Sequence, residues 1–162
     1  MNRTTAILAG AILLGTGAAF TIPDPPGLEG NPRVVDGDTL AFGSVKVRIW
    51  GIDAFESHQT CQQPAGTYPC GQAATVAMQN IIDGQQVRCV QHGNETSYGR
   101  IVATCYVGTR DIAKALVLKG WAFDYTRYSG GAYKDAENGA REVSAGAWAG
   151  AFQWPWDYRH HK

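Results

Sequence analysis

The chain lacks the surplus of basic side chains that is typical of nucleic-acid-binding proteins. It has 14 Lys and Arg residues against 14 Asp and Glu residues, so affinity for a polyanion would have to come from a local cluster. It also has no internal repeat and no CxxC pair, and its one long apolar run is too short to span a bilayer comfortably. These absences argue against a repeat protein, and they make a structural zinc site a weak hypothesis.

That apolar run lies at the N-terminus and has the pattern of an export signal. Arg3 precedes an apolar stretch at 6–15, and small residues follow up to Ala19. This order predicts a signal peptide at 1–19 that is cleaved after Ala19, with an uncleaved membrane anchor as the alternative. No Cys follows the small residues, which argues against a lipoprotein. We therefore expect a periplasmic or secreted protein that is free of the membrane and carries one more acid than base.

The rest of the chain reads as a lead-in and one domain. Residues 20–32 hold four of the seven prolines, which predicts a linker or an extended lead-in. Residues 33–159 have no second composition break, and the chain's 44% hydrophobic and 17% charged residues are an ordinary globular balance. A chain of 162 residues is long enough for one domain with a real core.

Hydrophobic periodicity predicts a mixed α and β domain. Val45, Val47 and Ile49 alternate with polar or outward positions, which is typical of a half-buried strand, and Gly43-Ser44 suits a hairpin turn before it. Further strands are predicted at 34–42, 86–92 and 101–107, a polar loop at 93–100, and helices at 71–83, 109–119 and 132–146. The Trp-rich tail is expected to cover the core.

Acidic residues interrupt and follow the first hairpin. Asp38 lies within the first strand run, where β propensity would not favour it, and Asp53 and Glu56 follow the second run. A turn at Gly43-Ser44 brings Asp38 to the level of Arg48, so these acids can meet at one end of the sheet. Clustered carboxylates repel each other unless a cation joins them. Hard oxygen donors favour Ca²⁺ or Mg²⁺ over Zn²⁺. Asp36 is expected to bond the backbone of the turn.

The four cysteines predict disulfides. An even number of Cys in an exported chain favours pairing, and three connectivities are open. We favour Cys61–Cys70, which would close the loop at 57–70, and Cys89–Cys105, which would link two strands of a hairpin.

With these residues in place, the chain resembles the staphylococcal nuclease (thermonuclease) family. The resemblance covers about residues 33–159 and rests on four segments in order: VVDGDT at 34–39, VRIWGIDAFE at 47–56, YGR at 98–100 and ALVLKGWA at 115–122. It implies an α+β OB-fold, a five-stranded barrel with about three helices packed on it. It also implies Ca²⁺-dependent hydrolysis of phosphodiester bonds in DNA and RNA, with low sequence preference and 3′-phosphate products.

The resemblance assigns roles residue by residue. It makes Asp38 and Asp53 the calcium carboxylates and the backbone carbonyl of Ala54 a further calcium ligand. Glu56 is the expected general base, which takes a proton from the attacking water. The guanidinium groups of Arg48 and Arg100 are expected to bind the phosphate through planar forks of donors. Tyr98 matches a phosphate-side tyrosine, and Tyr128 is a second expected substrate contact.

Some positions depart from the family pattern. Phe55 stands where the family often has Pro, so we expect a looser loop that the Cys61–Cys70 disulfide offsets. Ser97 replaces a Lys and predicts a weaker grip on the phosphate. Thr126 stands where a second tyrosine is expected, a role left to Tyr125 or Tyr128. His58 is interpreted as an exposed loop residue and not as a base or zinc ligand.

A second function is compatible with the fold. OB-folds also serve as non-catalytic modules that bind oligonucleotides or a protein partner. A pure binding module has no reason to keep the whole set of acids and arginines, so the enzyme is favoured. We expect a monomer with no stable protein partner.

Overall fold

The structure is a computed structural model that describes residues 27–160. The predicted signal peptide at 1–19 lies outside the described residues. The strands are β1 Leu28–Gly30, β2 Arg33–Asp36, β3 Thr39–Phe42, β4 Val45–Ile49, β5 Ile52–Ala54, β6 Cys61–Gln63, β7 Gly66–Tyr68, β8 Val87–Ser97, β9 Arg100–Val107, β10 Arg110–Asp111 and β11 Ala122–Asp124. The helices are α1 Cys70–Ile82, α2 Ile112–Leu118, α3 Thr126–Ser129, α4 Lys134–Glu142 and α5 Pro155–His160, with a 3₁₀ turn at Gly146–Ala149.

The main sheet has the strand order β1-β8-β9-β4-β3-β2, with β10 paired to β9. Strands β2, β3 and β4 form an antiparallel meander, and β4 then pairs with β9 in parallel although about fifty residues separate them. The five strands β2, β3, β4, β8 and β9, with this return connection, confirm the predicted OB-fold. The short strand β1 lies inside the expected lead-in at 20–32. This part of the lead-in therefore belongs to the sheet, where it pairs with β8 at the edge.

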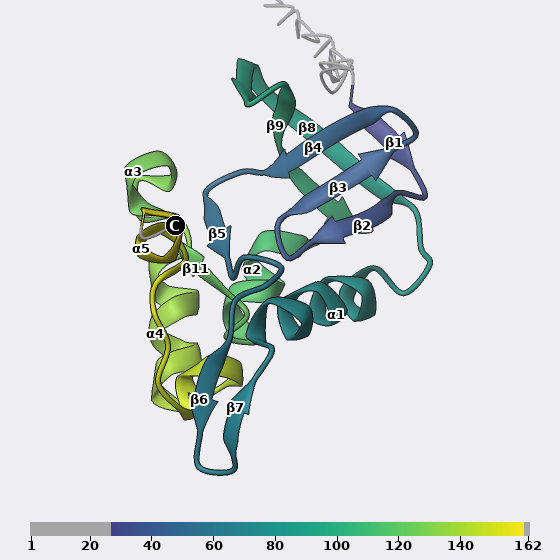
Figure 1. Ribbon diagram of the computed structural model, residues 1–162. Helices are drawn as coiled ribbons and strands as arrows, with labels where there is room; N and C mark the ends of the chain where they lie inside the picture. Colours follow the sequence, from purple (N-terminus) through teal and green to yellow (C-terminus); the bar gives the residue numbers. More distant parts are fainter. Residues whose placement is uncertain (1–26, 161–162) are drawn as a thin grey trace, which may run out of the picture.

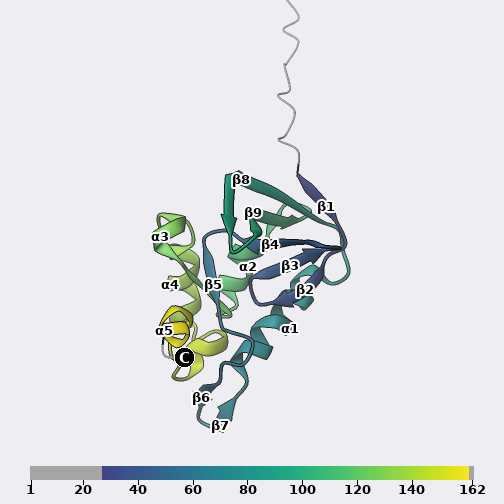
Figure 2. The same cartoon turned by 45° about the horizontal axis from the view of Figure 1, so that its top comes forward.

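The helices are divided between two sides of the molecule. The sheet and α1 lie on one side of the molecule, α4 and α5 lie on the other, and β5 runs between them (Figure 1). Figure 2 shows the same separation from a second direction. Helix α1 lies within one residue of the predicted 71–83 at each end, α2 and α4 are shorter than the predicted 109–119 and 132–146, and α3 and α5 are added. These two helices have only four and six residues, too few to show a helical period in the sequence.

The residues pack into two hydrophobic clusters. The larger one fills the barrel and its helices, from Leu40 and Val47 on the sheet to Leu116 on α2. The smaller one is mainly aromatic and lies between β5, β11 and the tail. We call it the aromatic cluster; it comprises Phe55, Phe123, Trp148, Phe152, Trp154 and Trp156 together with Cys61, Cys70, Ala74 and Ala147. The tail tryptophans therefore cover the core, as predicted.

Both predicted disulfides are present. Cys89 and Cys105 lie directly opposite each other on β8 and β9. Cys61–Cys70 closes the segment before α1, which is not a plain loop because β6 and β7 pair within it.

The loop predicted at 93–100 is wrong for most of its length. Strand β8 continues to Ser97, and the turn comes at Tyr98 and Gly99, where Ser97 pairs with Arg100. Residues 93–96 are exposed, and the register of β8 against β9 shifts between Gln91 and Thr96. Pairing resumes at Thr96 and Ser97, so the strand continues through residues of low β propensity. Within residues 27–160, no helix has the length and apolar character needed to cross a membrane.

Candidate active site

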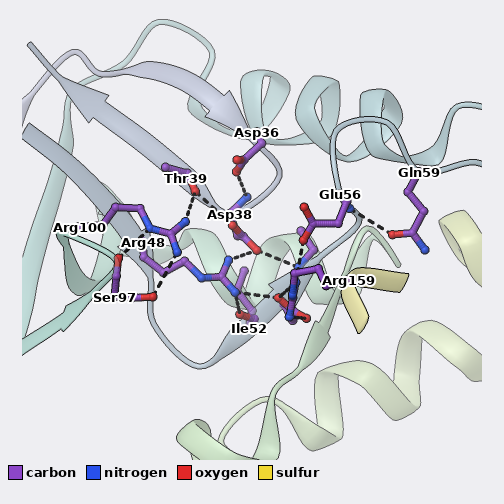
Figure 3. Close-up of polar contacts among 12 residues, drawn as sticks. Asp36, Asp38, Thr39, Arg48, Ile52, Glu56, Gln59, Ser97, Arg100 and Arg159 are labelled. Carbon is purple, nitrogen blue, oxygen red and sulfur yellow. Dashed lines mark hydrogen bonds and ion pairs between the residues drawn. The ribbon is translucent and has the colours of Figure 1, made fainter. Parts of the chain in front are cut away.

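A cleft of about 860 Å³ lies where the sheet meets the C-terminal helix α5. Its walls include side chains from β4, from the β8–β9 hairpin, from the loop after β5, and from α3 and α5. Most of the residues expected at the site line it: Asp38, Arg48, Ala54, Glu56, Tyr98, Arg100 and Tyr128. Asp53 lies just beneath the wall and is fully buried. The fold thus gathers the predicted residues at one place, and Figure 3 shows Asp38, Arg48, Glu56 and Arg100 among them.

Asp38 is held in the tight turn between β2 and β3. Its Oδ2 accepts a hydrogen bond of 3.0 Å from the backbone N–H of Ala54, and its Oδ1 accepts one of 3.2 Å from the hydroxyl of Thr39. Gly37 permits this approach, because a Cβ there would lie 2.7 Å from the Ala54 side chain. Asp36 accepts a 3.1 Å bond from the Asp38 N–H, in the turn-bonding role predicted for it.

Arg48 joins the two buried aspartates. Its Nη2 donates to Asp53 Oδ1 at 2.7 Å and to the carbonyl of Ile52 at 3.1 Å, and its Nη1 pairs with Asp38 Oδ2. Burial lowers the pKa of Arg48, and the charge of Asp53 opposes that shift. A fully buried carboxylate such as Asp53 requires partners of this kind.

Glu56 lies at the start of the loop after β5 and is partly exposed. Its backbone N–H donates to the side-chain oxygen of Gln59 at 3.1 Å, and Gln59 in turn donates to the carbonyl of Gln153 at 2.7 Å. Gln59 is fully buried. It therefore ties the backbone of the expected general base to the C-terminal tail.

Arg100 enters the site from the start of β9. Its Nε donates to the carbonyl of Ser97 at 3.0 Å, and its Nη2 donates to the Ser97 hydroxyl at 3.1 Å. Its Nη1 donates to Thr39 Oγ1 at 3.2 Å, and Thr39 is the residue that donates to Asp38. Ser97, which stands where a Lys was expected, thus helps to hold this guanidinium in place.

The tyrosines lie at the rim of the cleft. Tyr98 is 99% exposed at the tip of the β8–β9 hairpin, and Tyr128 is 58% exposed on α3. Tyr125 stacks on Trp156 with ring planes 5° apart and contacts Tyr128 at 5.0 Å between centroids. Tyr125 is thus held by packing, whereas Tyr98 and the exposed part of Tyr128 are accessible to a ligand. His58 is exposed, as interpreted.

Phe55 does not loosen the loop, contrary to the expectation. Its side chain is 1% exposed. The ring lies edge-on to Phe123 and Phe152, with centroids 5.1 and 5.5 Å apart. The aromatic ring anchors the loop by burial, where a proline would have restricted its backbone.

Arg159 is a residue of the site that the sequence reasoning missed. Its Nη1 and Nη2 donate to the two oxygens of Asp53 at 3.0 and 2.8 Å, and Nη1 also donates to Glu56 Oε1 at 2.7 Å. Burial lowers the pKa of Arg159, but the hydrogen bonds to Asp53 and Glu56 outweigh this effect, and the net pKa is raised. The only signal in the sequence was an arginine in a tail expected to pack on the body.

The donor set fits a hard cation in its chemistry. Asp38, Asp53 and Glu56 supply carboxylate oxygens, which Ca²⁺ and Mg²⁺ prefer. Among residues 27–160, however, no three His, Cys, Asp or Glu side chains are grouped closely enough to hold a metal. Guanidinium groups lie between these carboxylates in this structure (Figure 3).

Comparisons with known proteins agree with the geometry. Residues 46–150, more than half of the chain, match the family described as "Staphylococcal nuclease homologue". The chain is 28% identical over 149 residues to "Succinoglycan biosynthesis protein ExoI" of Rhizobium meliloti (strain 1021), covering 91% of this chain and 76% of that protein. It is 26% identical over 132 residues to "Probable staphylococcal-like nuclease CAN1" of Oryza sativa subsp. japonica, covering 78% of this chain and 36% of that protein. Asp38 and Arg159 both lie outside the segment that matches the family.

Proposed function

The chain belongs to the staphylococcal nuclease family, and from this premise we propose that it is a calcium-dependent nuclease that hydrolyses DNA and RNA with low sequence preference. The proposal rests on one observation, which is that the predicted acids and arginines meet at one cleft. Asp38, Arg48, Asp53, Glu56 and Arg100 come from separate strands, turns and loops and meet at the same cleft. A site with a base and several guanidinium groups has the parts that phosphodiester hydrolysis requires.

In the proposed reaction, the protein activates a water and neutralises the phosphate. Glu56, whose side chain is 33% exposed at the cleft, takes the proton of the attacking water. Arg100 offers a planar fork of donors to the phosphate oxygens, where negative charge increases in the transition state. Arg48 keeps the two aspartates together and adds positive charge beneath the phosphate. Cleavage on the 5′-oxygen side leaves 3′-phosphate ends.

Asp38, Asp53 and the carbonyl of Ala54 would hold the calcium ion, which when bound supplies positive charge to a phosphate oxygen. Asp53 and Ala54 lie on β5, which is paired with β11 and is buried on both sides. Asp38 is fixed to the same strand through the Ala54 N–H. The backbone of β5 therefore sets the spacing of all three expected ligands.

The surroundings of the site fit a substrate of extended shape. The cleft is open, and exposed aromatic rings at Tyr98 and Tyr128 offer stacking surfaces for bases. The lack of a basic surplus implies weak, salt-sensitive binding. Two disulfides are consistent with an oxidising compartment, and we propose that the protein acts as a monomer in the periplasm or outside the cell.

Digestion of single-stranded DNA with Ca²⁺ and then with chelator tests the proposal. We expect cleavage by the wild type with Ca²⁺, loss of cleavage with chelator, and loss of about 10²–10³-fold in kcat for Glu56→Gln, the size expected for a general base. The control is His58→Gln, an exposed residue two positions along the same loop, which should cleave normally. Binding of oligonucleotides without cleavage would instead support the non-catalytic module, and 5′-phosphate ends would refute the predicted cleavage position.

A further inference from the structure

The Arg159 guanidinium lies among the carboxylates of the candidate site. Arg159 lies in the last turn of α5, and its guanidinium bridges Asp53 and Glu56 (Figure 3). Asp53 is also one of the carboxylates expected to bind the metal, since Ca²⁺ takes oxygen ligands. Arg159 and a metal therefore need the same oxygens of Asp53.

The hydrogen bonds that Asp53 accepts leave little room for a metal ligand bond. Asp53 Oδ1 already accepts from Arg48 Nη2 at 2.7 Å and from Arg159 Nη1 at 3.0 Å. A carboxylate oxygen has two lone pairs, so these two donors use the capacity of Oδ1. Asp53 Oδ2 accepts from Arg159 Nη2 at 2.8 Å. A metal that binds Asp53 with its usual geometry must share or replace these bonds.

The charges of the site also indicate that Arg159 and a metal compete. In this arrangement two arginines, Arg48 and Arg159, neutralise most of the charge of Asp38, Asp53 and Glu56. A dication added to the same cluster would leave it positive overall, with a guanidinium within a few ångströms of the ion. Like charges at such a distance repel strongly where water is scarce.

Arg159 is also the arginine of this cluster that is able to leave. Arg48 lies on a paired strand and its side chain is 14% exposed, whereas the Arg159 side chain is 38% exposed. Arg159 is one residue from the end of α5 at His160, and the tail is fixed earlier, at Trp154 and Trp156, by ring stacking. Its side chain can swing into the cleft, which it lines, without disturbing the aromatic cluster.

We propose that Arg159 is an internal counter-ion of the metal site, bound to Asp53 and Glu56 when the metal is absent and displaced from them when calcium binds. The inference rests on the proposed function, since it needs a metal at these carboxylates. It gives the tail a specific role, which is to keep the acidic residues together and to offset most of their charge until the metal binds. The calcium affinity then depends on competition between the ion and the Arg159 side chain for Asp53.

Calcium titration by calorimetry, with no substrate present, tests the displacement. We expect Arg159→Gln to bind Ca²⁺ about tenfold or more tightly than the wild type, because the ion no longer displaces a charged, forked hydrogen bond. Arg159→Lys should fall between the two, since it keeps the charge and loses the fork. The matched control is Arg127→Gln, which removes the same charge from the same cleft wall and should change the affinity little.

Thermal unfolding gives a second readout that does not depend on activity. In chelator, Arg159→Gln should melt below the wild type because its carboxylates repel each other, and added Ca²⁺ should raise its Tm by more than it raises that of the wild type. Equal calcium affinities in the two proteins, or weaker binding by Arg159→Gln, would overturn the displacement and leave the proposed nuclease intact. Absence of calcium binding in both proteins would overturn the displacement together with the calcium site.

Discussion

The two walls of the cleft hold their functional side chains in different ways. On the sheet side, backbone pairing sets the positions: Thr39 lies opposite Arg48, and Arg48 lies opposite Val102. On the tail side, Arg159 is carried by a helix of six residues that reaches the body through stacked rings, such as Trp156 on Tyr125. One wall is built from paired strands, the other from the aromatic cluster.

This difference predicts how each wall responds to the loss of one side chain. Strand pairing is directional and repeated along β3, β4 and β9, so the removal of one side chain leaves the neighbours in register. Ring packing concentrates on a few large side chains, and above all on Phe123, which contacts the rings of Phe55, Trp148, Phe152, Trp154 and Trp156. A single substitution in the aromatic cluster should therefore unfold the tail wall. A single substitution on the sheet wall should lower activity and leave the fold intact.

The largest expected effect comes from Phe123→Ala, which removes the centre of the aromatic cluster. Loss of a fully buried Phe ring should lower the free energy of unfolding by about 3–5 kcal/mol, measured by denaturant titration, and should speed trypsin cleavage at Arg159. Phe42→Ala is the control on the sheet side, where the ring is only half-buried. Equal losses in the two variants would contradict the contrast between the walls.

Next in size is Arg100→Ala, which removes a phosphate-facing guanidinium from the sheet wall. We expect kcat to fall by about 10²–10³-fold, as for the loss of one donor that stabilises transition-state charge, with a change in unfolding free energy below about 1 kcal/mol. Arg100→Lys should restore only part of the rate, because an ammonium group lacks the planar fork. A variant that unfolds as easily as Phe123→Ala would refute the independence of the sheet wall.

A smaller effect is expected for Gln59→Leu, which cuts the link between the walls. The Glu56 N–H and the Gln153 carbonyl would lose their shared partner in the interior, which should cost about 1–3 kcal/mol of stability. Gln62→Leu, on the exposed β6–β7 hairpin, should change stability by about 0.5 kcal/mol or less. If both substitutions have the same small effect, Gln59 does not join the two walls.

The smallest effect is expected for Tyr98→Ala at the rim of the sheet wall. The side chain is 99% exposed, so unfolding should change by about 0.5 kcal/mol or less. KM for single-stranded DNA should rise about two- to tenfold with kcat unchanged, the range for one hydrogen bond of about 0.5–1.5 kcal/mol. Tyr98→Phe separates the hydroxyl from the ring, and an unchanged KM in Tyr98→Ala would remove Tyr98 from the substrate contacts.

Local patterns in the sequence were sufficient to predict most of the sheet wall. The turn at Gly43-Ser44 fixes the register of β3 and β4, so the closeness of Asp38 to Arg48 could be predicted from strand alternation alone. The pairing of Cys89 with Cys105 likewise required only a hairpin between them. The end of β8 was misjudged, because pairing with β9 resumes at Thr96 and Ser97 after a shift in register, in a segment that propensity assigns to a loop.

Contacts across the chain could not be predicted in this way. Arg159 meets Asp53 over 106 positions, and Gln59 meets Gln153 over 94 positions. Neither pair follows from a period or a turn. Each depends on how the aromatic cluster seats the tail on β11 and on the loop after β5.

The sequence by itself therefore determined the first hairpin, the main strands and the chemical types gathered near Asp38 and Arg48, and it favoured the disulfide pairing that is present, because these follow from short-range periodicity and turn geometry. Only the tertiary structure showed that Arg159 is the arginine that contacts both Asp53 and Glu56. That position depends on ring packing between β11 and a C-terminal helix, and apolar packing of this kind is non-directional and leaves no spacing in the sequence to be read.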